Sequence, residues 1–161
     1  MCRKVKNKQN NISYKVRRLC QLWSKLNDYY FNNFDKRHLQ FPEPILKELI
    51  KDKFGLKESS DKSYDFDGNI ELKSSTKENG NTPFKFSQSQ CKRIIYCEIV
   101  NGFVNVYELS DKDVSEINLN VKKEYNLNQK NSVQLNISCG QYKADAKVTY
   151  KFDLSKGVFA E

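Results

Sequence analysis

Apolar residues recur at helical spacing in two stretches near the start of the chain. Between positions 14 and 33 they repeat every three or four residues, which predicts a long amphipathic helix. The stretch FPEPILKELIKDKFG has prolines near its start and Gly55 just past its end, as expected of a second helix. We expect the wide, aromatic stripe of the first helix to pack on the core; it comprises Val16, Leu19, Trp23, Leu26 and Tyr30, with Leu22 and Tyr29 beside them.

After Gly55 the pattern changes to strands. Residues 70–76 form a predicted strand that follows an Asp-Gly turn. The stretch RIIYCEIVNGFVNVYEL predicts a hairpin, and its first run is apolar at nearly every position, as in a strand covered on both faces. VQLNIS and KADAKVTYKFDL alternate, and the second predicts a half-buried antiparallel strand. KENGNTPFKFSQSQ is predicted to be a polar loop, and SDKDVSEINLNV a short helix.

The order of two helices followed by strands predicts an α/β (α+β) fold, a mixed sheet with helices packed on it. A length of 161 residues with 38% hydrophobic residues suits one domain with a real core. We therefore expect a basic flexible arm over residues 1–13 and a single domain over residues 14–161. No run of about 18 apolar residues is present, so we expect no membrane span and no membrane partner.

The formal net charge of +8 is concentrated at the N-terminus. Eight Lys or Arg residues and no acid precede Asp28. A basic arm of this kind suits a polyanion such as nucleic acid, although it could equally be a solubilising tail. The five cysteines form no CxxC pair, so a reducing cytoplasm is the simplest expected location.

The stretch YDFDGNIELKSS crowds charged residues around one turn. Glu71 and Lys73 are two apart on a strand and therefore share a face. If the loop takes the three residues 67–69, Asp65 falls opposite Glu71. Two carboxylates held that close favour a shared cation, and Mg²⁺ is the expected ion because it prefers oxygen ligands. The alternative is an ordinary exposed hairpin with charged side chains.

The second helix offers two further carboxylates. Glu43 lies at the edge of its apolar stripe and could act as an additional metal ligand or base, or simply as an acid at a helix N-terminus. Glu48 lies further round toward solvent.

Asp65 followed by Glu71-Leu72-Lys73 resembles the active-site signature of the PD-(D/E)xK nuclease superfamily, which includes most type II restriction endonucleases. Tyr64 stands where that signature has Pro. Because the gap to Glu71 is short, Asp67 is an alternative to Asp65. The layout of residues 19–109 is also similar to small restriction enzymes that cut short GC-rich sites.

The resemblance implies a restriction-endonuclease-like core, a mixed sheet flanked by helices. It implies a Mg²⁺-dependent endonuclease, with Mn²⁺ as a possible substitute, that acts as a homodimer on double-stranded DNA at a short specific sequence and leaves 5′-phosphates. Asp65 and Glu71 would hold the metal, and Lys73 would position or activate water. A modification methyltransferase would be expected as a genomic neighbour.

Residues after the signature are candidates for DNA contact, because hydroxyls suit phosphate while amides and lysines can read base edges. They are Ser74, Ser75, Thr76, Lys77, Asn79, Asn81, Lys85, Gln88 and Gln90. An ordinary polar loop is the alternative for any one of them. The rival functions are a structure-selective repair or junction nuclease and a non-catalytic DNA-binding protein. His38 is the only histidine, so a nuclease mechanism based on histidine is not expected.

Overall fold

The fold is taken from a computed structural model that describes residues 12–62, 64–76, 84–87, 93–108, 123–125, 133–137 and 148–160. The side chains of 84–87, 123–125, 133–137 and Val148 are outside that description. The two predicted helices are confirmed as α1 (Tyr14–Asn33) and α2 (Glu43–Phe54). Residues 1–11 of the predicted arm and the predicted short helix near residue 115 lie outside the described residues.

Local sequence explains where both helices begin and end. The side chain of Ser13 accepts a hydrogen bond from the Val16 N–H at 3.4 Å and so caps α1. Ile12, directly before this cap, is already buried in the core. The second helix ends at Gly55, whose φ of 66° places it in the left-handed conformation that terminates many helices.

The main sheet is mixed and five-stranded, in the order β1-β3-β4-β7-β8. Among its described strand pairs, β1–β3 alone is parallel. A second sheet has the order β2-β6-β5. The bounds are β1 (Ile70–Ser75), β2 (Phe84–Ser87), β3 (Arg93–Val100), β4 (Phe103–Glu108), β5 (Lys123–Tyr125), β6 (Val133–Ile137), β7 (Val148–Asp153) and β8 (Val158–Phe159). The α+β class and the predicted 93–108 hairpin are thus confirmed.

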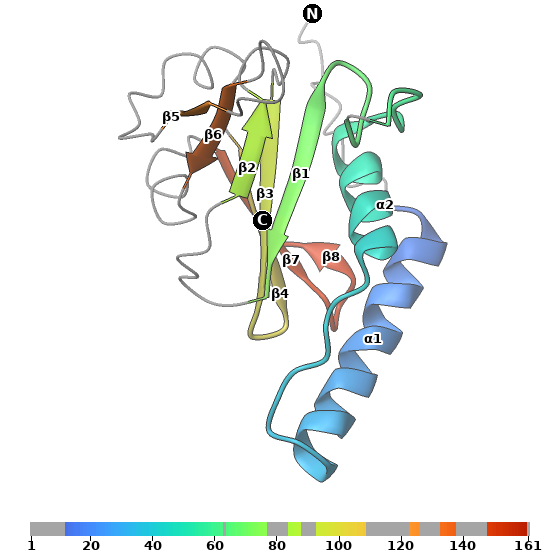
Figure 1. Cartoon of the computed structure of the whole chain (residues 1–161). Helices are drawn as coiled ribbons and strands as arrows, with labels where there is room; N and C mark the ends of the chain where they lie inside the picture. The colour runs from blue at the N-terminus through green and yellow to red at the C-terminus, as the bar shows by residue number, and fades with distance from the viewer. Residues whose placement is uncertain are drawn as a thin grey trace, which may run out of the picture.

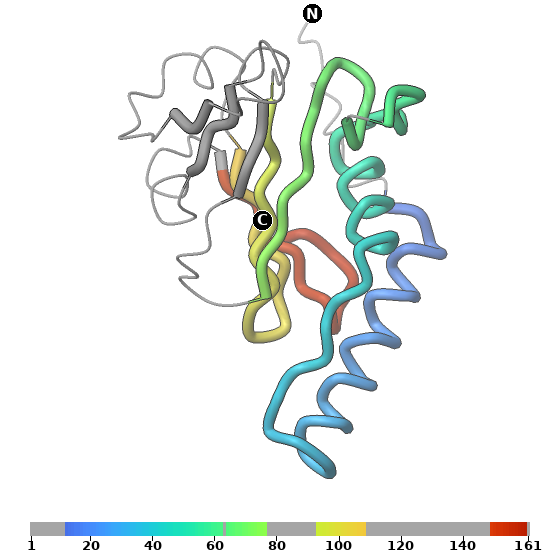
Figure 2. Tube along the Cα trace, in the orientation of Figure 1, coloured from blue at the N-terminus to red at the C-terminus, as the bar shows by residue number. Residues whose placement is uncertain are grey.

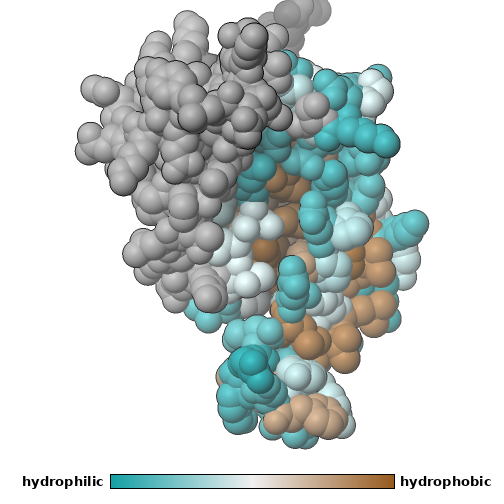
Figure 3. Space-filling view, in the orientation of Figure 1, coloured by the Kyte–Doolittle hydropathy of each residue, from teal (hydrophilic) through white to brown (hydrophobic). Residues whose placement is uncertain are grey.

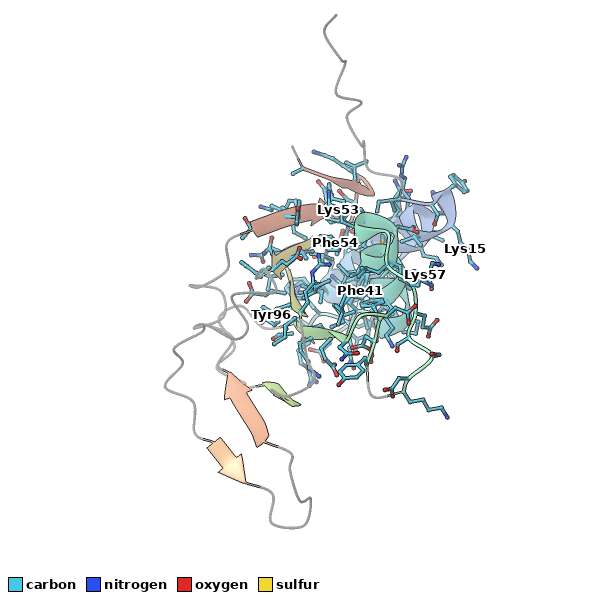
Figure 4. All side chains as sticks on the ribbon, turned by 90° about the horizontal axis from the view of Figure 1, so that it is seen from above. Lys15, Phe41, Lys53, Phe54, Lys57 and Tyr96 are labelled. Atoms are coloured by element: carbon cyan, nitrogen blue, oxygen red, sulfur yellow. The ribbon has the colours of Figure 1, made fainter. Side chains whose placement is uncertain are left out.

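Both described helices cover the same face of the main sheet (Figure 1). The core lies in this layer, where Leu46, Leu49 and Ile50 of α2 are fully buried together with sheet residues such as Ile95 and Phe152. Strand β3 is buried at every position except its ends, which confirms its prediction as a central strand. Viewed from above, Phe41 lies on the helix side of the sheet and Tyr96 on the other side (Figure 4).

The face of the sheet that points away from the helices mixes polar, aromatic and aliphatic side chains, and on β3 its residues Ile94, Tyr96 and Glu98 are buried. Strand register aligns Lys73, Tyr96, Tyr107 and Thr149 in one row across β1, β3, β4 and β7. Glu71 occupies the same face two residues before Lys73. The fold therefore separates an apolar helix-covered face from a face that carries the candidate chemistry.

The expected packing of α1 is only partly correct. Its buried positions are Val16, Cys20, Ser24 and Asn27. The helix extends beyond the end of the sheet, where nothing described covers its outer side (Figure 2). Hydrophobic atoms consequently gather along the surface of α1 (Figure 3). We call this surface the α1 row; it consists of Leu19, Leu22, Leu26 and Tyr29, all exposed.

A second difference concerns the stretch predicted as a polar loop. Residues 84–87 form β2 and pair antiparallel with β6. The alternation of Phe84 and Phe86 with polar residues is a strand signal, but the polar flanks and Pro83 obscured it. Across the described parts of the chain, no helix has the length and apolar character needed to cross a bilayer.

Candidate functional site

The turn before β1 brings the predicted carboxylates together. Phe66 and Ile70 exchange backbone hydrogen bonds of 3.1 and 3.3 Å, which leaves a three-residue loop over residues 67–69. Gly68 and Asn69 adopt positive φ values of 85° and 60° to close it. The loop length assumed from the sequence is therefore correct, and Asp65 lies opposite Glu71.

Asp65 is fixed from two directions. Its Oδ1 lies 2.8 Å from the Nζ of Lys47, which reaches it from α2. Its Oδ2 accepts a 2.8 Å hydrogen bond from the backbone N–H of Leu72 on β1. The side chain is 18% exposed, so the carboxylate is held in a partly desolvated position between helix and strand.

Glu71 lies between a like charge and an opposite one. Its Oε2 is 3.2 Å from the Nζ of Lys73, and its side chain is 16% exposed. On its other side it faces the carboxyl group of Asp65 across the three-residue loop, and the charge of Asp65 acts on it. The arrangement is thus two neighbouring carboxyl groups flanked by the ammonium groups of Lys47 and Lys73.

The two carboxyl groups have pKa values displaced in opposite directions. Burial and the neighbouring charge of Asp65 raise the pKa of Glu71 above its usual value, against the effect of Lys73. Burial acts the same way on Asp65, but its hydrogen bonds with Lys47 and the Leu72 N–H hold its pKa below the usual value. The pair therefore takes up its first proton on Glu71, as two like charges in one site require.

This donor set fits a small divalent cation. Mg²⁺ is usually held by one or two carboxylates, with phosphate and water completing the shell. The positive charge that two adjacent carboxylates need is supplied here by the two lysines. No cluster of three or more His, Cys, Asp or Glu occurs within the described ranges.

The other acidic candidates lie outside this contact. Asp67 is exposed at the tip of the turn, so the geometry favours Asp65 as the partner of Glu71. Glu43 is exposed and lies one helical turn before Lys47. The pKa of Lys47 is raised mainly by its hydrogen bond with Asp65, and the charge of Glu43 adds a smaller effect in the same direction. Glu48 binds Lys51 at 2.7 Å on the outside of α2 and does not reach the pair.

The candidate DNA-contacting residues are only partly described. Ser75 shares the face of Glu71 and Lys73, whereas Ser74 is exposed on the other face and Thr76 is exposed just after β1. The backbone of Lys85 lies in β2, and its side chain is outside the description. Five further candidates lie outside the described residues, namely Lys77, Asn79, Asn81, Gln88 and Gln90.

Lys47 is the site residue that the sequence did not predict. It belongs to a helix whose other lysines, such as Lys51, look the same in sequence. Its one distinguishing signal is its spacing of four residues from Glu43, which places both on one helical face. Only the packing of α2 beside β1 reveals that this face meets Asp65.

Comparisons of the chain with protein-family models, with curated proteins and with solved structures gave no match.

Proposed function

We propose that this protein is a metal-dependent endodeoxyribonuclease of the type II restriction class, which hydrolyses phosphodiester bonds in double-stranded DNA. The observation that carries the proposal is the turn that sets Asp65 opposite Glu71, with Lys73 two residues further along the same strand face and 3.2 Å from Glu71. Adjacent carboxylates with a nearby ammonium are suited to hold a divalent cation against a phosphate.

Each residue of the cluster has a distinct role in this proposal. Asp65 and Glu71 hold Mg²⁺, or Mn²⁺ in its place, which supplies charge stabilisation to the phosphate. Lys73 orients the attacking water and stabilises developing negative charge. Lys47 holds Asp65 in position from α2. The charge of Glu43 contributes to the raised pKa of Lys47, and Glu43 would lie at the edge of the site.

The substrate and assembly follow from charge and exposed surface. The concentration of basic residues before Asp28 supports binding to the DNA backbone. A cut in both strands needs two centres, hence two copies of the chain around a two-fold axis. The α1 row supports such pairing, because Leu19, Leu22, Leu26 and Tyr29 have the three-four-three spacing of a two-helix seam.

The finer fold assignment also belongs to this proposal. We take the sheet and its turn to be a restriction-endonuclease-like core, with the carboxylate pair at the edge strand β1. The sequence signature supports it.

The test is a plasmid cleavage assay with the full chain and Mg²⁺. Wild-type protein should give discrete fragments, whereas Glu71→Ala and Lys73→Ala should abolish cutting yet still bind DNA in Ca²⁺. Glu48→Ala and Lys51→Ala are matched controls, because they remove the same residue types from an ion pair on the outside of α2, away from the site. Full cutting by both site variants would overturn the site, and DNA binding without cutting by wild type would overturn the nuclease assignment.

A further inference from the structure

A separate cavity of about 180 Å³ lies where β1 and β3 end, beside α1. Asn27 and Ile99 on its lining are buried, whereas Thr76, Asn101 and His38 are exposed. The cavity is therefore closed at one end by the core and open to ligand at the other. Its position at the carboxyl ends of a parallel strand pair is a common one for ligand crevices.

Hydrogen bonds fix the polar groups of this cavity. The backbone N–H of Leu39 donates to Asn27 Oδ1 at 2.8 Å, which orients the amide so that Nδ2 faces His38 Nδ1 at 3.1 Å. His38 Nδ1 is then an acceptor, and this network assigns the ring proton to Nε2. Trp23 is held in the same way, since its indole N–H donates to the carbonyl of Gln40 at 3.3 Å.

The size and charge of the cavity restrict its ligand. It is smaller than the clefts of about 300–1,000 Å³ that hold drug-sized molecules, yet a cavity of about 150 Å³ is enough for benzene. It therefore suits one substituted six-membered ring rather than a whole nucleotide. Among the described residues, its lining includes an aromatic ring, a hydroxyl and amides and no Lys, Arg, Asp or Glu, which favours an uncharged hydrogen-bonding ring.

We propose that this cavity binds one unpaired pyrimidine base of a DNA strand. Trp23 supplies aromatic surface, while the Thr76 hydroxyl and the Asn101 amide offer hydrogen bonds to the base edge. A base inside a duplex is stacked and paired, so only a single-stranded or extruded base can enter. Thr76 lies five residues beyond Glu71, which corresponds to about 17 Å along an extended strand. A single DNA strand covers the same distance in about five base steps. The use of this cavity in substrate positioning rests on the proposed function, whereas base binding does not.

Trp23 makes the proposal directly measurable, because it is the only tryptophan in the chain. The full chain, in buffer with EDTA, is titrated with a thymidine oligonucleotide and with an abasic strand of equal length. We expect the thymidine strand to quench the Trp23 fluorescence saturably. Its affinity should be about tenfold or more above that of the abasic strand, because the abasic strand has no bases to stack on the ring. Equal binding and equal quenching by both strands would mean that only the backbone binds and would overturn the proposal, as would equal quenching by a fully paired duplex.

Variants locate the binding. Thr76→Val and Asn101→Gly should each weaken binding of the thymidine strand several-fold and leave the abasic strand unaffected; Gly suits the positive φ of 52° at position 101. Asn32→Ala, on the exposed surface of α1, is the control. Wild-type affinity in both cavity variants would overturn the assignment. If the wild-type chain binds the thymidine strand as expected but does not cut DNA, the proposed function alone is refuted. The two results are separable because the titration contains no metal and requires no cleavage.

Discussion

The Nζ of Lys47 lies 2.8 Å from Oδ1 of Asp65, so a residue of α2 provides a close counter-charge to a carboxylate in the turn before the edge strand. This contact ties the helix layer to the turn that carries the candidate chemistry. It also occupies one oxygen of the carboxylate that we propose as a metal ligand. Lys47 should therefore affect both the stability of the fold and the affinity for a cation.

Lys47→Met is expected to have opposite effects on these two properties. Loss of the charged hydrogen bond should lower the free energy of unfolding by about 1.5–3 kcal/mol. Removal of a competing ammonium should at the same time raise the affinity for Mn²⁺, measured by electron paramagnetic resonance titration. Lys51→Met is the control, because its pair with Glu48 is at the surface and should contribute under about 1 kcal/mol. Unchanged metal affinity in the Lys47 variant would show that Asp65 is not a ligand.

Glu71→Gln should make the protein more stable at neutral pH, because it removes a charge that the site disfavours. The pKa of Glu71 is raised in the folded chain, first by burial and then by Asp65, so folding favours its protonated form. Below its ordinary value of 4.5 the group is neutral in both folded and unfolded chains, and the variant should then match wild type. As the pH rises through the raised pKa, only the wild type acquires the charge.

The expected gain for Glu71→Gln at pH 7 is on the order of 0.2–1 kcal/mol, the size of the contribution that side-chain pairs make when they lie opposite each other on strands. Urea unfolding at about pH 4 and pH 7 measures it. A variant less stable than wild type at pH 7 would mean that Lys73 outweighs Asp65 at this position.

Gly157→Ala should destabilise the fold by more than its backbone strain alone. A Cβ at position 157 would clash with Cγ of Arg17, and the φ of 70° is unfavourable for alanine. Gly55 has a similar φ of 66° but open space around it, so Gly55→Ala isolates the backbone effect. We expect the Gly157 variant to lose about 1–3 kcal/mol more than the Gly55 variant in chemical denaturation. Equal losses would show that Arg17 moves aside without cost.

The α1 row should control self-association. Replacing Leu22 and Leu26 together by Glu should shift the sedimentation coefficient from that of a dimer to that of a monomer, because charge would line the proposed seam. Tyr14→Glu changes an exposed aromatic residue that lies off the row and should leave the assembly unchanged. A wild-type protein that sediments as a monomer at all concentrations would refute pairing through this surface.

Local sequence signals predicted most of the elements and the spacing within the turn. The Pro-to-Gly asymmetry of α2, the Asn101-Gly102 turn and the run of apolar residues in β3 each act over a few positions, and each is present in the structure. The opposition of Asp65 and Glu71 could be predicted for the same reason, since it depends only on the length of one loop.

Properties set by distant parts of the chain could not be predicted in this way. The parallel pairing of β1 with β3, the contact of Lys47 with Asp65 and the exposure of the α1 row depend on how elements meet. An apolar helical stripe does not reveal whether a sheet lies beneath all of it. The cavity beside Trp23 is likewise assembled from α1, its connector, β1 and the β3–β4 turn, which no local pattern links.

The parallel register of β1 and β3 has a consequence for how the chain acquires its chemistry. The α2 helix and the β3–β4 hairpin can each form from neighbouring residues, whereas β1 joins the sheet only by closing a long loop to β3. The short turn can set Asp65 opposite Glu71 early, whereas the strand that carries Glu71 and Lys73 is anchored in the sheet only later. A nascent or partly folded chain would hold the carboxylate pair on an unanchored strand, so any reactivity it confers would mature together with the final closure of the sheet.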